Sequence, residues 1–131
     1  MTKYLRIIII FLLLFFPIYL SEQLNSEVKL NNVSKIFLII SGSGEQSILS
    51  DLFTSLPSEV IINGFIQNSD IRTYSLPFSE NNITLIWNYL LNDCSHMFEG
   101  QRNIIKIDFS EFVSSNVENM NYMFNKCLLL R

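Results

Sequence analysis

Few residues of this chain combine a type and a spacing that could support chemistry. His96 is the single histidine, and Cys94 stands two positions before it. This pair would supply two ligands, whereas a structural zinc ion takes four. The carboxylates are dispersed along the chain, so a nucleophile, a base and an orienting group cannot be assembled around one histidine. The sequence therefore predicts no catalytic, metal or cofactor site, and we do not expect an enzyme.

A Ser-Gly-Ser-Gly stretch at residues 41–44 is the other segment that invites a chemical interpretation. It follows an apolar run and could cradle a phosphate group. However, it lacks the Lys-Ser/Thr pair of a P-loop, and two glycines separated by one residue are a weak signal on their own. The pattern favours a plain tight turn.

The last third of the chain repeats itself at a spacing of 26 residues. The positions that recur are Leu91, Cys94, Met97 and Phe98, answered by Val117, Met120, Met123 and Phe124. Both copies place apolar groups at i, i+3, i+6 and i+7, which is one stripe of a helix. Residues 104–109 between them alternate like a half-buried strand. A strand with a short helix every 20–29 residues is the unit of a leucine-rich-repeat solenoid, so we expect function to come from a stacked surface.

A helix start signal accompanies the second copy. Ser115 and Glu118 form a capping box, in which the Ser hydroxyl and the Glu carboxylate each accept a hydrogen bond from an orphan backbone N–H. The signal agrees with the apolar stripe and predicts a helix over residues 117–124.

The two cysteines do not share the spacing of the repeat. Cys94 and Cys127 stand 33 positions apart rather than 26. If Cys94 stacked on Met120, Cys127 would lie about 10 Å further along a helix. A disulfide needs Cα atoms within about 7 Å, so the spacing favours free thiols over an intramolecular bridge.

The N-terminus has the layout of a secretory leader. Lys3 and Arg6 precede an unbroken apolar run over residues 7–16 that continues to Leu20. The run is shorter than the ~20 residues that cross a bilayer. We interpret residues 1–21 as a signal peptide, and a retained signal anchor stays open because no small-x-small cleavage pattern follows. Residues 22–32 form a polar lead-in, and we expect a secreted or cell-surface location.

Charge and sequons fit an exported chain. The formal net charge is −3, and removing the leader leaves seven Lys and Arg against twelve Asp and Glu, with no basic stripe. A nucleic-acid partner is therefore not expected, because phosphate binding needs clustered cations. Asn32 and Asn82 begin N-glycosylation tripeptides, which are weak signals in a chain rich in asparagine.

Between leader and repeats, residues 33–90 predict a small strand-rich cap. Apolar and β-branched runs indicate strands at residues 35–40, 71–76 and 83–87, with a short helix over residues 47–53. Asn63-Gly64 between two apolar runs predicts a hairpin with a two-residue type I′ turn. Such a cap would cover the open end of a repeat stack.

The repeat region resembles the BspA-like leucine-rich-repeat surface proteins. The resemblance covers residues 94–130 and rests on Met97-Phe98-x-Gly100, Ile107-Asp108-Phe109-Ser110-x-Phe112, Ser115-Asn116-Val117-x-Asn119-Met120 and Met123-Phe124-x-x-Cys127. Gln101 stands where the family has a cysteine, and the array stops after one repeat and a fragment. From the repeat spacing and the resemblance together, the positions predicted to form the repeat core are Leu91, Cys94, Met97, Phe98, Ile105, Ile107, Phe109, Phe112, Val117, Met120, Met123 and Phe124.

The expected fold is therefore α/β: a leucine-rich-repeat-like solenoid over residues 91–131, one full repeat plus part of a second, behind the N-terminal cap. The resemblance implies an exported, non-catalytic surface protein that mediates adhesion to a protein or cell-surface ligand. The membrane would be met only through an uncleaved leader. An alternative is a truncated fragment without binding activity of its own. For the second copy, burial of the Met/Phe stripe in a core and exposure as a partner-binding groove both stay open.

Overall fold

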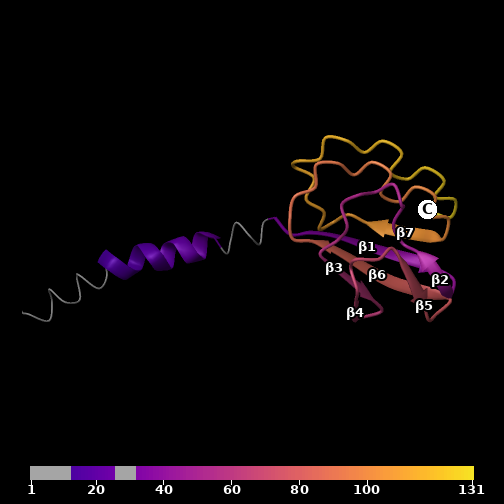
Figure 1. Ribbon diagram of the computed structural model, residues 1–131, viewed down its shortest axis with the longest axis horizontal. Coiled ribbons are helices and arrows are strands. Elements are labelled where there is room, and N and C mark those ends of the chain that lie inside the picture. The colour runs from indigo at the N-terminus through magenta and orange to yellow at the C-terminus, as the bar shows by residue number, and fades with distance from the viewer. Residues whose placement is uncertain (1–12, 26–31) are drawn as a thin grey trace, which may run out of the picture. The chain divides into compact units, whose positions relative to one another are not determined.

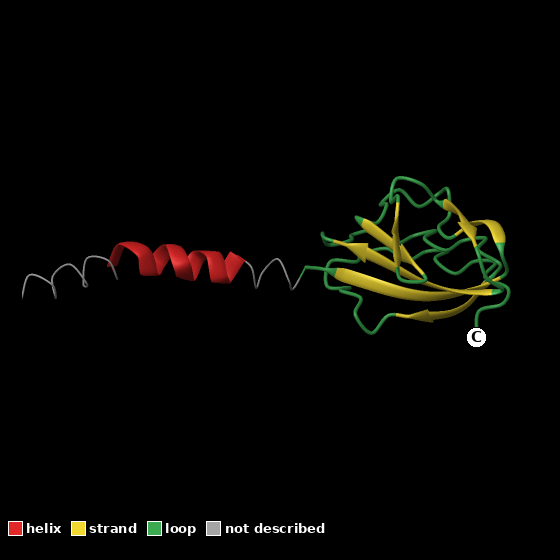
Figure 2. Ribbon diagram, turned by 90° about the horizontal axis from the view of Figure 1, so that it is seen from below, coloured by secondary structure: helices red, strands yellow, loops and turns green. Residues whose placement is uncertain are grey.

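The computed structural model describes residues 13–25 and 32–131 and divides the chain into two compact units, Met1–Asn32 and Val33–Arg131. In the first unit, residues 13–25 form a helix (Figure 2), and the side chains of this helix are exposed. Within the described residues, no helix is both long enough and apolar enough to cross a membrane. The cationic start of the predicted leader and residues 26–31 of the lead-in lie outside the described residues.

The second unit is built from antiparallel strands. Its strands are β1 Ser34–Ser41, β2 Gly44–Ser47, β3 Glu59–Ile62, β4 Phe65–Gln67, β5 Thr73–Leu76, β6 Glu80–Trp87 and β7 Ile104–Asp108. Five of them form one sheet in the order β4-β3-β6-β1-β7, and β2 pairs with β5 in a second, two-stranded sheet. Figure 1 shows β1 and β6 as the long central arrows of the larger sheet.

Strict alternation of side chains fixes which face of the large sheet is buried. In β1, Ile36, Leu38 and Ile40 are buried while the residues between them are half-buried. β6 follows the same rule and pairs with β1 over eight positions. Because side chains in a strand alternate between faces, this register gathers all the buried groups on one side. They join a single hydrophobic cluster that lies entirely within Val33–Arg131, so this unit carries its own core.

The predicted hairpin is confirmed. β3 and β4 pair across Asn63 and Gly64, whose φ angles are 51° and 86°. Positive φ at both central residues is the requirement of a type I′ turn, which asparagine and glycine tolerate best. The strands predicted at residues 35–40 and 83–87 are confirmed within β1 and β6. The strand predicted at residues 71–76 is confirmed from Thr73 to Leu76 as β5, and the strand predicted at residues 104–109 is confirmed from Ile104 to Asp108 as β7.

A buried asparagine ties the turns of the unit together. The Asn81 amide nitrogen donates hydrogen bonds to the carbonyl oxygens of Gly42 (3.0 Å) and Phe78 (2.7 Å). The Asn81 amide oxygen accepts from the Asn63 side chain at 2.9 Å. Burying an amide costs free energy unless it is hydrogen-bonded, and here both ends of the amide are bonded. Residues 41–44 thus contain the turn between β1 and β2, and Asn81 fixes this turn through its hydrogen bond to the Gly42 carbonyl.

The predicted α/β solenoid is wrong. The unit is mostly antiparallel sheet, and neither residues 91–98 nor residues 117–124 are helical. His96 and Gly100 have φ angles of 59° and 78°, whereas a helix needs φ near −63°. In addition, β7 pairs antiparallel with β1 instead of joining a parallel array of repeat strands. The short helix predicted over residues 47–53 is also absent, since that segment is irregular after β2.

Candidate interaction surface

The two copies of the repeat form two turn-rich segments that lie side by side. We call residues 91–101 coil 1 and residues 117–127 coil 2. In Figure 1 they are the orange and yellow traces that run next to each other above the sheet. Leu91, Cys94, Met97 and Phe98 of coil 1 belong to the hydrophobic cluster that also contains the buried face of the sheet.

A ladder of backbone hydrogen bonds joins the coils. The N–H groups of coil 1 at every second position donate to carbonyl oxygens of coil 2. The pairs are Cys94 to Asn119 (2.8 Å), His96 to Asn121 (3.0 Å), Phe98 to Met123 (2.9 Å) and Gly100 to Asn125 (2.8 Å). One bond runs the other way, from Glu118 N–H to Asn92, and Asp93 forms a parallel bridge with Asn119. Coil 2 thus adds to coil 1 as one strand adds to another, although neither coil is a strand.

Both coils repeat the same backbone turns. The N–H groups of Met97, Glu99 and Gln101 each donate to a carbonyl three residues earlier. Met123, Asn125 and Cys127 do the same in coil 2. The left-handed positions also correspond, since His96 and Gly100 in coil 1 are matched by Tyr122 and Lys126 in coil 2. Apolar spacing of three residues therefore reflects successive tight turns, and this is why the helix interpretation failed.

Side chains repeat the register of the backbone. The rings of His96 and Tyr122 are stacked, with centroids 5.2 Å apart and planes inclined by 14°. Phe98 and Phe124 are likewise stacked at 6.1 Å and 13°. Such aromatic contacts add stabilisation beyond the burial of area. Both pairs are separated by the 26 residues of the sequence repeat.

A carboxylate links the coils from the side. Glu99 contacts His96 Nδ1 with one carboxylate oxygen and accepts a hydrogen bond from the Asn125 amide with the other at 2.6 Å. These hydrogen bonds hold the pKa of Glu99 below its ordinary value, the bond with His96 contributing most. Glu99 therefore links His96 within coil 1 and Asn125 of coil 2, and we call these two contacts the Glu99 clasp.

The residues predicted to form the repeat core divide into three groups. Buried members are Leu91, Cys94, Met97, Phe98 and Met123. Half-buried members are Ile105, Ile107, Phe109, Phe112 and Val117. Exposed members are Met120 and Phe124. Coil 1 is covered by coil 2, but no described residue covers coil 2 in the same way, and two of the four apolar positions of the second copy, Met120 and Phe124, are exposed.

The predicted helix cap has no helix to cap. Ser115 lies in an exposed turn, and Glu118 is exposed and uses its backbone N–H to bond coil 1. Ser115 therefore lies in the turn before coil 2, and Glu118 lies within coil 2, where its N–H bonds to coil 1. Of the candidate glycosylation residues, Asn82 is exposed on β6, and Asn32 lies in a half-buried turn before β1.

Exposed apolar side chains gather on coil 2 and the residues after it. The exposed fractions are 49% for Met120, 64% for Tyr122, 41% for Phe124, 67% for Leu128 and 41% for Leu129. An apolar pocket of about 320 Å³ opens here between Phe109, Phe112, Met120 and Phe124. Edge-to-face ring contacts of Phe109 with Phe112 (5.5 Å) and Phe124 (5.9 Å) shape its wall.

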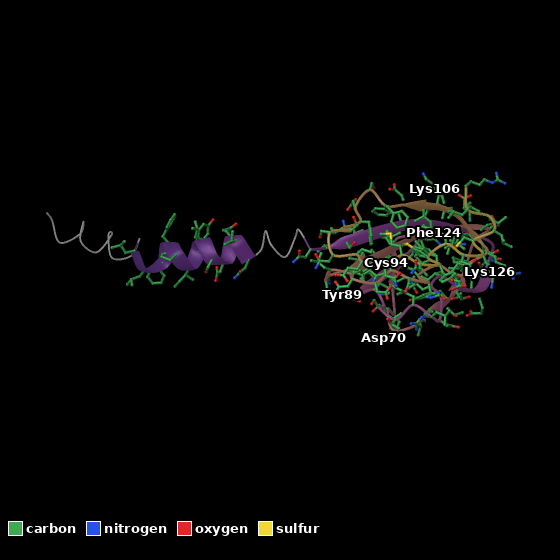
Figure 3. The ribbon with its side chains drawn as sticks, turned by 90° about the horizontal axis from the view of Figure 1, so that it is seen from above. Asp70, Tyr89, Cys94, Lys106, Phe124 and Lys126 are labelled. Atoms are coloured by element: carbon green, nitrogen blue, oxygen red, sulfur yellow. The ribbon has the colours of Figure 1, made fainter. Side chains whose placement is uncertain are left out.

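Coil 2 also carries an edge of unused backbone donors. Met120, Tyr122, Phe124 and Lys126 stand 26 residues after the four donors of coil 1. Their own N–H groups donate no hydrogen bond within the described part of the chain. All four residues are exposed, and Phe124 and Lys126 are labelled in Figure 3. We call these four N–H groups, with the exposed apolar side chains beside them, the coil 2 edge.

The cysteine thiols are free and face inward. Cys94 is buried, and its pKa is raised to about 11 by burial and, to a smaller degree, by the negative charge of Asp93. Cys127 is half-buried and donates from Sγ to the carbonyl oxygen of Phe98 at 3.1 Å. Burial also raises the pKa of Cys127. Both thiols therefore serve packing between the coils rather than nucleophilic chemistry.

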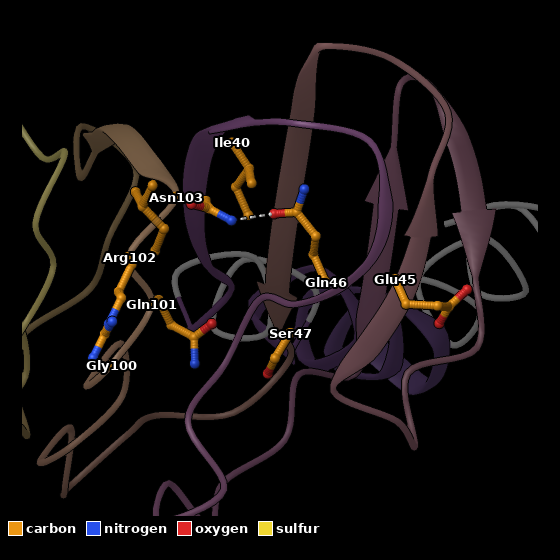
Figure 4. A pocket seen from close by; sticks show the side chains of 9 residues that line it. Ile40, Glu45, Gln46, Ser47, Gly100, Gln101, Arg102 and Asn103 are labelled. Carbon is orange, nitrogen blue, oxygen red and sulfur yellow. Dashed lines mark hydrogen bonds between the residues drawn. The ribbon is translucent and has the colours of Figure 1, made fainter.

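A polar groove of about 360 Å³ lies at the other end of coil 1, between Ile40 of β1, residues 45–47 of β2 and residues 100–104. Figure 4 shows Asn103 donating to the Gln46 side chain across it, at a distance of 3.0 Å. Glu45 and Arg102 line its two sides. Its side chains include no histidine, cysteine or serine–base pair, so the groove has no arrangement for nucleophilic catalysis.

Acidic side chains near the coils serve as turn acceptors. Asp93 accepts from the Ser95 N–H at 2.7 Å and Asp108 from the Ser110 N–H at 2.8 Å. Hydrogen bonding by Ser95, through its side chain and then its N–H, lowers the pKa of Asp93, and hydrogen bonding by the N–H and then the side chain of Ser110 lowers the pKa of Asp108. Among residues 13–25 and 32–131, no group of three or more His, Cys, Asp and Glu side chains is placed to hold a metal ion.

The coil 2 edge is the feature that sequence reasoning missed. The sequence did contain its signal, because a 26-residue repeat implies that the second copy presents outward whatever the first copy presents to the second. The helix interpretation assigned these N–H groups to hydrogen bonds within a helix, so it could not predict that every second N–H group of coil 2 would point outward. Comparisons with protein-family models, curated proteins and solved structures found no match.

Proposed function

We propose that this chain is an exported, non-catalytic surface protein that binds another protein through the coil 2 edge. The observation that carries the proposal is the coincidence of unused N–H donors with exposed Met120, Tyr122 and Phe124. Contiguous apolar surface rimmed by polar groups is typical of protein-binding sites. The resemblance of residues 94–130 to BspA-like surface proteins and the apolar, leader-like N-terminus favour adhesion outside the cell.

Two experiments test the proposal separately. Export is tested by fusing residues 1–30 to a reporter, which is expected outside the cytosol. Adhesion is tested by displaying residues 33–131 on a non-adherent cell and counting the cells that bind to candidate host or neighbouring cells. Replacing Tyr122 and Phe124 by serine is expected to reduce attachment about tenfold, since aromatic side chains dominate binding energy at interfaces.

A matched control uses apolar residues that are exposed elsewhere. Phe65 and Ile66 on the β3–β4 hairpin are more exposed than Met120, Tyr122 or Phe124 of coil 2. Replacing Phe65 and Ile66 by serine is expected to leave attachment unchanged. Equal attachment by the coil 2 variant and the unmodified protein, or a reporter retained in the cytosol, would argue against the proposal.

A second candidate is a fragment without binding activity, in which the same exposed side chains cause self-association. Exposed Leu128 and Leu129 favour it, because uncovered apolar surface promotes aggregation. Sedimentation distinguishes the two. A monomer that attaches to cells supports adhesion, whereas concentration-dependent oligomers without attachment support the fragment.

A further inference from the structure

We infer that the partner of the coil 2 edge is a polypeptide segment from a different chain that docks backbone to backbone, presenting carbonyl oxygens at every second residue. The inference rests on the proposed function and specifies the chemistry of the partner. It starts from the interface between coil 1 and coil 2, which the molecule has already built with four N–H donors at alternate positions.

The coil 2 edge continues that interface outward. Its four donors repeat those of coil 1 at the same 26-residue spacing, on a backbone with the same left-handed positions. Within the described chain no acceptor meets them, whereas the equivalent donors of coil 1 are all satisfied. An edge of this kind is a template for a further segment, as the open edge of a sheet is for a peptide. Carbonyl oxygens at alternate residues are the complement it requires.

The side chains of coil 2 also leave apolar surface open to a docked segment. Phe124 stacks on Phe98 of coil 1 and is still 41% exposed. The pocket of about 320 Å³ between Phe109, Phe112 and Phe124 is of a size to take an apolar side chain. A docked segment would therefore be both bonded at its backbone and anchored by an aromatic or aliphatic residue.

A second whole copy of this chain is a poor occupant. Two coil 2 edges facing each other would place donors against donors. On coil 1, the Met97 carbonyl already accepts from the Ser50 N–H at 3.0 Å, and Leu49 and Phe53 of that segment are buried. Neither coil of a second copy therefore offers a complete row of open carbonyls, so the inferred partner is a different chain.

A synthetic peptide with the sequence of residues 115–131 is the probe. Its carbonyls correspond to those that coil 2 offers to coil 1, and free in solution they are open. We expect saturable binding to the isotopically labelled 33–131 unit, with hydrogen exchange slowed at least about tenfold at the N–H groups of Met120, Tyr122, Phe124 and Lys126.

Two controls define specificity. The N–H groups of Cys94 and His96 are expected to keep their exchange rates. A peptide that replaced coil 2 would protect these two donors but leave the N–H groups of the released coil 2 unprotected, so slowed exchange at the four donors of coil 2 distinguishes docking from displacement. A peptide carrying Tyr122→Ser and Phe124→Ser is expected to lose binding. Absence of peptide-dependent protection at the four donors would overturn the inference, and so would protection produced by self-association of the unit alone. Adhesion that depends on Tyr122 and Phe124 without such protection would overturn the docking mode and leave the proposed function standing.

Discussion

The imidazole ring of His96 stacks on the phenol ring of Tyr122, with centroids 5.2 Å apart and planes inclined by 14°. Both residues occupy left-handed backbone positions, at φ 59° and 58°. A non-glycine residue at positive φ is uncommon, and two of them at one repeat spacing mark a shared local geometry. The stacked rings therefore show that the two coils are aligned residue by residue at the 26-residue spacing of the repeat.

Loss of this stack should weaken the docking of coil 2. A double-mutant cycle with His96→Ala and Tyr122→Ala is expected to give a coupling free energy of about 0.5–1.5 kcal/mol, the range of aromatic pairs. The free energy of unfolding of each variant, from urea titrations of the 33–131 unit, supplies the four corners. A coupling near zero would mean that the rings are adjacent without stabilising each other.

The Glu99 clasp predicts a pH dependence. The pKa of Glu99 lies below its ordinary value of 4.5 because His96 and then Asn125 hydrogen-bond its carboxylate. A group whose pKa is lower in the folded state stabilises the fold above its unfolded pKa, and that contribution is lost as the pH falls through the folded pKa. The melting temperature of the unmodified unit should therefore fall more steeply below pH 4.5 than that of Glu99→Gln. Parallel melting curves for the two proteins across this range would contradict the clasp.

Replacing two methionines should separate the covered coil from the open one. Met97 is fully buried and Met120 is half exposed. Met97→Ala is expected to lower the free energy of unfolding by about 2–5 kcal/mol, and Met120→Ala by less than about 1 kcal/mol. Chemical denaturation measures both. Comparable losses would place Met120 in a core.

Replacing Asn81 should lower the free energy of unfolding far more than replacing its neighbour Asn82. Asn81→Ala leaves the carbonyls of Gly42 and Phe78 without this donor inside the fold, at an expected cost of about 2–4 kcal/mol. Asn82→Ala, one position along β6 and exposed, is the matched control and should cost less than about 0.5 kcal/mol. Thermal unfolding of the two variants provides the comparison.

Cys94 should resist alkylation. With a pKa of about 11, roughly one thiol in a thousand is ionised at pH 8, against about one in ten at the ordinary value of 9.0. Iodoacetamide should therefore modify Cys94 in the folded Cys127→Ser variant at least about 100-fold more slowly than in the same protein unfolded in urea. Equal rates in the two states would show that the thiol is accessible and ionised.

Local sequence was sufficient for most of the strands, although β2 lies partly where a turn and a helix were predicted. The β-branched and aromatic run of β1, the alternation in residues 83–87 of β6 and the Asn63-Gly64 turn each specify their own geometry, because they are properties of a few adjacent residues. The 26-residue repeat was also visible, and it did indicate two equivalent segments. Their conformation was not, since apolar residues three apart suit a helix and a chain of tight turns equally well.

Only the tertiary structure decided between a helix and a chain of tight turns for these two segments. The left-handed positions at His96 and Tyr122 are sustained by the ladder from coil 1 to coil 2, whose bonds join residues about 25 apart. Pairing of β7 with β1 likewise depends on a register across some seventy residues. Short-range patterns cannot encode such pairings, because the free energy that selects them comes from contacts made after the chain has closed on itself. The same contacts determine which N–H groups remain unused, and so where a partner can dock.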